Sequence, residues 1–175
     1  HNPSSFQSEK ESADRIAVEE YFALISAFKV IKGGREQVRI NKYNCSATEL
    51  LEFIVNRFDF KFTAGQEKAV NEIYDNLRSP LKMNRLLQGD VGSGKTAVAL
   101  CGIFMAVKSG KRAAYLSPTE VLAEQNYHIL QRFFPDYTVG YLAGGMTAKE
   151  KREVKEMLKN GEIDILIGTN ALVSD

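Results

Sequence analysis

The residues with the clearest chemical meaning form one continuous stretch, Gly89-Asp90-Val91-Gly92-Ser93-Gly94-Lys95-Thr96. The stretch matches the pattern G-x-x-x-x-G-K-[ST], whose glycines let the backbone wrap a phosphate closely and aim several N–H groups at it. In this pattern the lysine reaches the outer phosphates of a nucleoside triphosphate, and the final hydroxyl coordinates the Mg²⁺ that bridges them. We therefore expect all eight residues to bind the triphosphate. Lys95 and Thr96 are the expected catalytic residues, and Thr96 is the expected metal ligand.

The segments on either side of this loop have the character that such a site requires. The apolar run 85–88 before the loop predicts a β-strand, and the apolar residues 95–108 after it predict a helix. The positive end of that helix would face the phosphates. A flexible surface turn needs neither flanking element, so the context favours a phosphate-binding loop.

Other helices are predicted by capping signals, in which a Ser or Thr and a Glu or Gln three residues later satisfy the free amides of a helix start. The pairs with this spacing are Ser46 with Glu49, Thr63 with Gln66, and Thr147 with Glu150. The first of these helices is expected to bury the apolar residues Leu50, Leu51, Ile54 and Val55. The second is expected to end just before Pro80, because proline cannot continue a helix.

From Pro80 onward, short apolar runs alternate with helical patterns. The runs are 85–88, 113–116, 137–142 and 163–167, and the helical patterns are 95–108, 119–133 and one that begins at Thr147. Such alternation implies parallel strands joined by right-handed crossovers. The predicted fold class is α/β, with a parallel sheet flanked by helices. A further helix over residues 12–30 is expected before it, and the polar stretch 32–47 is expected to contain a domain boundary.

Composition excludes some classes of protein and leaves others open. The 23 basic and 22 acidic residues give a net charge of +1, which supplies no overall field for attracting a polyanion. The longest apolar stretch, 97–107, is much shorter than the roughly 20 residues that span a bilayer. Cys45 and Cys101 lack metal-ligand spacing and are expected to be reduced thiols, which favours the cytoplasm. The start has neither a Met nor a secretion signal, so we expect a piece of a longer protein.

Several segments together resemble the superfamily 2 helicases and, within them, bacterial DNA helicases that migrate branched junctions. The likeness covers nearly the whole chain. Residues 85–96 resemble the phosphate loop of that family, 60–66 its adenine-reading motif, 118–125 its motif that touches the DNA backbone, and 142–145 and 167–172 its next two strand-end motifs. Residues 2–3 and 15–22 resemble the helix that leads out of a DNA-splitting wedge domain.

This resemblance implies an ATP-driven motor whose cofactors are ATP and Mg²⁺. It implies that residues 48–175 are the first part of a RecA-like motor domain and that residues 1–47 are a helical linker from an upstream domain. The implied adenine-binding residues are Phe60, Thr63 and Gln66, and the implied DNA contacts are Pro118, Thr119, Gln125, Gly144, Gly145 and Thr169. The implied partners are branched DNA, namely replication forks and four-way junctions, with no membrane partner.

The resemblance further implies DNA repair and recombination in the bacterial cytoplasm, at the nucleoid, by a monomeric full-length protein. Two departures are visible. Asn170 stands where the family commonly has His, and the chain stops at Asp175 before the acidic motif that helps to hold Mg²⁺. The second departure leads us to expect that residues 1–175 alone are inactive.

Simpler explanations exist for several of these residues. Gln66 and Thr119 have helix-capping positions whatever their function, and Phe60 and Phe62 alternate, so that one should face the core and the other a base. The lysines between 149 and 159 are interleaved with glutamates, which favours a solvated helix face over a DNA-binding patch. The phosphate loop alone also fits a small-molecule kinase, a GTPase or a non-catalytic nucleotide-binding scaffold.

Overall fold

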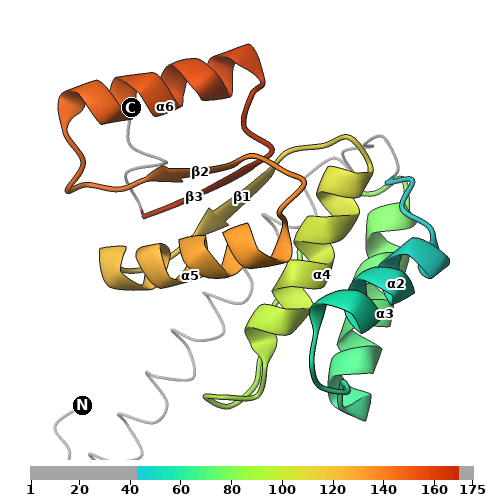
Figure 1. Ribbon diagram of the computed structural model, residues 1–175. Helices are drawn as coiled ribbons and strands as arrows, with labels where there is room; N and C mark the ends of the chain where they lie inside the picture. Colours follow the sequence, from blue (N-terminus) through green and yellow to red (C-terminus); the bar gives the residue numbers. More distant parts are fainter. Residues whose placement is uncertain (1–42, 170–175) are drawn as a thin grey trace, which may run out of the picture. The chain divides into compact units, whose positions relative to one another are not determined.

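The computed structural model describes residues 43–169, which lie in the second of two compact units of the chain, Ile40–Asp175. Figure 1 shows a small sheet with helices around it. The elements are α2 (Ala47–Arg57), α3 (Ala64–Arg78), α4 (Lys95–Lys108), β1 (Ala113–Leu116), α5 (Glu120–Phe133), β2 (Val139–Leu142), α6 (Ala148–Asn160) and β3 (Ile165–Gly168). The helix expected over residues 12–30 and the expected boundary between 1–47 and 48–175 involve residues outside the described part, so both stay predictions.

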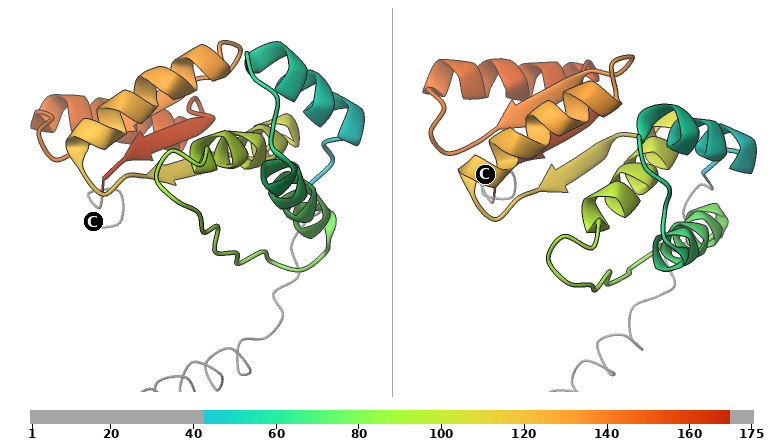
Figure 2. Two further views of the ribbon diagram at one scale, coloured as in Figure 1. Left: turned by 90° about the horizontal axis from the view of Figure 1, so that it is seen from below. Right: turned by 60° about the horizontal axis from the view of Figure 1, so that its bottom comes forward.

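The sheet has the strand order β1-β3-β2, and all of its pairings are parallel. The helices α5 and α6 cover opposite faces of this sheet (Figures 1 and 2). All four residues of the central strand β3 are buried, because neighbouring strands flank it and helices cover it. The predicted α/β class with a parallel sheet flanked by helices is therefore confirmed.

The strand predicted over residues 85–88 is absent from the described structure. These residues form no regular element, and the side chain of Leu86 is 86% exposed. A β-strand exists only through backbone pairing with a neighbour, and no strand of the described sheet lies beside this segment. The apolar sequence alone could not supply that partner, so the prediction is wrong for this structure.

The three predicted capping signals all form, and each pairs a hydroxyl with the amide three residues later while the Glu or Gln side chain returns to the capping amide. The buried face predicted for α2 is only half right. Leu50 is buried, but Leu51 and Val55 are 61% and 68% exposed. Phe53 is buried in their place. The helical spacing therefore predicted an apolar face on α2 but not which residues belong to it. Phe53 belongs to this face because its ring packs against other aromatic rings.

Helix α4 lies at the centre of the apolar core. It is buried along most of its length because it packs against α2 and α3 on one side and against β1 on the other (Figure 2). An aromatic cluster fills the space beside it. The ring of Phe53 stacks on Phe104 of α4 with centroids 4.2 Å apart, and also on Phe134 at 5.5 Å. The position of α4, and hence of the loop before it, is fixed by this packing.

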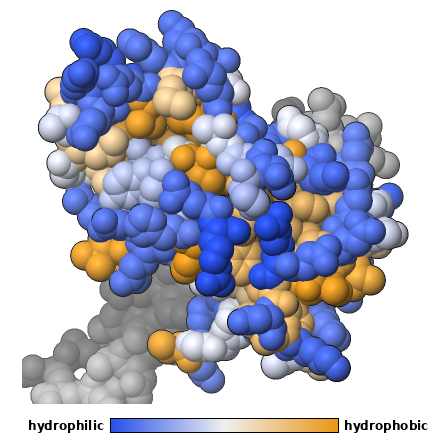
Figure 3. Space-filling view, viewed as in Figure 1, coloured by the Kyte–Doolittle hydropathy of each residue, from blue (hydrophilic) through white to orange (hydrophobic). Residues whose placement is uncertain are grey.

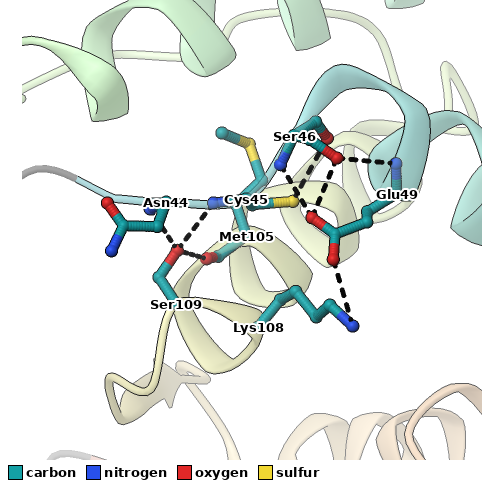
Figure 4. A network of polar contacts seen from close by, with 7 residues as sticks. All are labelled: Asn44, Cys45, Ser46, Glu49, Met105, Lys108 and Ser109. Atoms are coloured by element: carbon teal, nitrogen blue, oxygen red, sulfur yellow. Dashed lines mark hydrogen bonds and ion pairs between the residues drawn. The ribbon is translucent and has the colours of Figure 1, made fainter.

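The hydrogen bonds around Ser109, called the polar clasp below, hold the C-terminal end of α4 (Figure 4). Ser109 Oγ accepts hydrogen bonds from the N–H groups of Asn44 and Cys45 at 2.9 and 3.1 Å. The same hydroxyl donates to the carbonyl of Met105 at 2.7 Å. These hydrogen bonds hold the chain that leads into α2 on the last turn of α4. The Cys45 beside them is buried, and this burial raises the pKa of its thiol to about 11, with the charge of Glu49 as a smaller contribution.

Replacing the hydroxyl of this clasp should destabilise the fold. We expect Ser109→Ala to lower the free energy of unfolding by about 1–3 kcal/mol, because the buried Cys45 amide loses its acceptor. Thr48→Ala removes a neighbouring exposed hydroxyl and should change stability by less than about 0.5 kcal/mol. Urea unfolding of both variants measures the difference, and equal stabilities would contradict the role of the clasp.

Candidate nucleotide and nucleic-acid site

The start of α4 differs from the starts of the other described helices. Ser46, Thr63, Thr119 and Thr147 cap α2, α3, α5 and α6 through their side-chain oxygens. Helix α4 begins after Gly94 and has no side-chain cap. Its first N–H groups therefore keep their hydrogen-bonding capacity for an anion, and the helix dipole favours negative charge there.

The glycines of the loop have roles that only glycine fills easily. Gly92 and Gly94 have φ values of +80° and +78°, in the left-handed region that side chains disfavour. A Cβ on Gly94 would also lie 2.2 Å from Gln66 Nε2, and one on Gly89 would lie 2.7 Å from Ser93 Oγ. The loop is thus a tight cradle that a methyl group would obstruct, which fits the phosphate role expected from the motif.

The side chain of Lys95 lies inside the curve of this loop. Its ammonium donates to the carbonyls of Gly89 and Asp90 at 2.8 and 2.6 Å. The positive charge therefore lies against the backbone of the loop itself. Thr96 follows at the surface, with its hydroxyl on the first turn of α4.

Two residues of the expected adenine-reading motif meet the phosphate loop. The Gln66 amide accepts from the N–H of Thr63 at 2.9 Å and donates to the carbonyl of Ser93 at 2.9 Å. Thr63 and Gln66 line a cavity of about 230 Å³ together with Gly89, Ser93 and Lys95. The capping explanation for Gln66 is correct, and the bond to Ser93 adds a second contact. Sequence spacing could not reveal that bond.

Phe60 lies in a different hollow from this cavity. It lines a larger cavity of about 680 Å³ together with exposed apolar side chains of α2, and its ring is 49% exposed. Phe62 is partly buried against the core, as the alternation indicated for one of the two rings. The rings are nevertheless stacked on each other, with centroids 5.8 Å apart. Opposite faces were expected, but residues 58–63 do not form a strand.

Most of the residues implied as DNA contacts gather at the edge of the sheet where the carboxyl ends of its strands lie. The last residues of the three strands, Leu116, Gly168 and Leu142, are partners in the strand register. The segments that follow are consequently adjacent, because parallel strands end on the same side. These segments carry Pro118 and Thr119 after β1, Gly144 and Gly145 after β2, and Thr169 after β3. Gln125 lies farther along α5 and is exposed.

Two charged side chains at this edge were given no role by the sequence. Glu120 of α5 accepts a hydrogen bond from the N–H of Gly145 at 2.9 Å, and Lys151 of α6 donates to the carbonyl of Gly144 at 2.6 Å. An acidic residue in the first turn of a helix and a lysine on a charged helix are ordinary in themselves. The sequence therefore carried no signal that they meet the same turn.

The charged helix α6 agrees with the solvated face that its glutamates indicated. It has no buried residue, and its outward side is hydrophilic (Figure 3). Lys149 and Glu153, which are four residues apart on this helix, form an ion pair at 3.9 Å. Within residues 43–169 no cluster of His, Cys, Asp or Glu is suited to a metal, so a cation at the loop would depend on the Thr96 hydroxyl and phosphate oxygens. The described helices are also too short or too polar to cross a membrane.

Comparison with known proteins agrees with this geometry. Residues 63–175 match the DEAD/DEAH box helicase family. Along its whole length the chain is 42% identical to ATP-dependent DNA helicase RecG of Streptococcus pneumoniae and 40% identical to that of Bacillus subtilis. It spans about a quarter of those relatives, 26% of each.

A solved structure of RecG bound to a three-way DNA junction is also similar. Its sequence is 39% identical, and the match covers 99% of this chain and 24% of that one with a TM-score of 0.79. The helicase resemblance seen in the motifs is thereby confirmed. With the family match extending over more than half of its residues, this chain belongs to the DEAD/DEAH box helicases.

Proposed function

We propose that this chain is the nucleotide-binding part of an ATP-driven motor that remodels branched DNA. The observation that carries the proposal is the hydrogen bond from Gln66 to Ser93, which joins the adenine-reading motif to the phosphate loop in one cavity. The similarity to RecG, one structure of which is bound to a three-way junction, supports branched DNA as the substrate. Replication forks and four-way junctions are the forms that we propose.

Each residue of the site has a defined task in this proposal. The loop amides and the uncapped start of α4 bind the phosphates, and Lys95 stabilises the negative charge that develops on the transferred phosphoryl group. Gln66 and Thr63 read the adenine edge while they hold the loop. Phe60 lines a separate hollow, so no contact with the base is proposed for it. Bound Mg²⁺ would neutralise phosphate charge, with the Thr96 hydroxyl as its protein ligand. The protein's contribution is chiefly positioning and electrostatics.

The sheet edge is the DNA-facing side in this proposal. The N–H groups at Thr119, Gly145 and Thr169 lie near strand ends and helix starts, where an anionic backbone is favoured. The wider setting that we propose is a monomeric full-length protein in the bacterial cytoplasm, acting at the nucleoid in recombination and repair. The bacterial relatives and the DNA substrate support this setting.

A different phosphate-loop enzyme, such as a small-molecule kinase or GTPase, remains the contrasting hypothesis. It explains residues 89–96 but assigns no purpose to the bond between Gln66 and Ser93. A nucleotide-binding scaffold without catalysis could use that bond, but it does not account for the match to helicases along the chain. The helicase match and the bond together therefore favour the DNA motor.

The proposal is tested with Lys95→Ala in the full-length protein. We expect ATP hydrolysis stimulated by a branched DNA junction to fall by about 100-fold or more, because the transferring charge loses its cation. Lys82→Ala removes an exposed lysine outside the site and should leave the rate within about twofold. Hydrolysis by the wild-type protein that branched DNA does not stimulate would show that the proposed function is wrong.

The link between the two motifs gives a second prediction. Gly92→Ala and Gly94→Ala both place a side chain at positive φ, but only the Cβ on Gly94 meets Gln66. We expect Gly94→Ala to weaken ATP binding at least about threefold more than Gly92→Ala does.

Nucleotide titration of the pair in a Gln66→Ala background provides the control. There the difference between the two glycine variants should disappear, because the obstructing amide is gone. A difference that persisted in that background would mean that Gln66 does not hold the loop.

A further inference from the structure

The Gly144–Gly145 turn after β2 is contacted by a carboxylate from a different element. Glu120, the first residue of α5, accepts the Gly145 N–H at 2.9 Å. A Cβ on Gly144 would lie 2.6 Å from Glu120 Oε1, and one on Gly145 would lie 3.0 Å from Oε2. Apart from chain neighbours, no other described residue comes within 4 Å of either position. The two glycines therefore leave an opening that the carboxylate fills.

The chemistry of this opening suits an anion. A backbone N–H in a glycine-rich turn donates equally well to a carboxylate and to a phosphate oxygen. The ammonium of Lys151 stands at the same turn, on the carbonyl of Gly144. An anion that accepts the Gly145 N–H thus has a positive charge close by.

We infer that Glu120 sets the affinity of this protein for DNA, by holding the position that a backbone phosphate takes at the Gly144–Gly145 turn. The inference rests on the proposed function, in which this turn meets the DNA backbone. One N–H cannot serve both anions fully, and two negative charges repel each other at this distance. DNA binding at the turn consequently requires the Glu120 side chain to move away.

The surroundings of Glu120 allow that movement. The residue is exposed, and within the described part of the chain the Gly145 N–H is its single hydrogen-bond partner. Rotation of the side chain into water therefore breaks one bond and leaves α5 intact. Thr119 continues to cap that helix through the amide of Leu122 at 3.3 Å.

Two other roles for Glu120 predict different effects of its removal on DNA binding. If the carboxylate only stiffened the turn into the shape that phosphate needs, its removal would weaken DNA binding. If its charge acted only at long range, any nearby carboxylate would have the same effect. Comparison of these three roles requires variants that separate charge from hydrogen bonding.

The experiment measures binding of a fluorescent three-way DNA junction to the full-length protein at one fixed salt concentration. The variants are Glu120→Ala, Glu120→Gln, Glu124→Ala and Glu124→Gln. Glu124 is a matched control because it is exposed on the same helix. The two carboxylates also lie in the same surroundings, since both raise the pKa of Tyr141, although burial is the larger cause of that shift. Removal of either one changes the net charge equally. A circular dichroism melt of each variant checks that it is folded.

We expect Glu120→Ala to bind the junction about 3- to 10-fold more tightly than the wild type. Glu120→Gln should lie between them, since its amide oxygen still accepts the N–H but carries no charge. The Glu124 variants should change affinity by less than about twofold.

Equal effects at residues 120 and 124, or weaker binding by Glu120→Ala, would overturn the inference while wild-type DNA binding persists. A wild-type protein that binds ATP but no junction would refute the proposed function instead, and the inference with it.

Discussion

The burial of α4 is the interaction on which the rest of this structure depends. The helix is apolar around most of its circumference, and residues of α2, α3 and the aromatic cluster enclose it. Apolar burial is non-directional, so it fixes where the helix lies but not how its ends are arranged. The ends are set by polar contacts: Ser109 at one end, and the phosphate loop with Gln66 and Lys95 at the other. Packing provides the rigid axis, and hydrogen bonds provide the geometry of the site.

Two glycine-containing segments of the described structure, the phosphate loop and the Gly144–Gly145 turn, follow one physical rule. Each exposes backbone groups that the fold does not satisfy through regular structure, and in each a charged side chain contacts them. Lys95 donates to carbonyls of the phosphate loop, and Glu120 accepts from an amide of the Gly144–Gly145 turn. The lysine has the sign that attracts phosphate, whereas the glutamate has the sign that repels it. In the functions proposed above, the same kind of contact favours phosphate at the loop, whereas Glu120 opposes it at the Gly144–Gly145 turn.

Local signals in the sequence predicted most of the fold. The capping pairs and the run 113–116 correspond to real elements because the information that forms them lies within a few neighbouring residues. The loop motif was equally local. The contact of Glu120 with Gly145 and that of Gln66 with Ser93 join residues that are 25 and 27 positions apart. Such contacts depend on strand order and helix packing, which no short pattern specifies.

The run 85–88 shows that a local pattern can also predict an element that does not form. Its apolar residues satisfy the local requirement for a strand, yet strand formation also needs a neighbour, and the described sheet offers none there. The phosphate loop keeps its compact shape all the same. Gln66 holds the Ser93 carbonyl, and Lys95 holds those of Gly89 and Asp90. Side chains of α3 and α4 therefore stabilise the conformation of this loop.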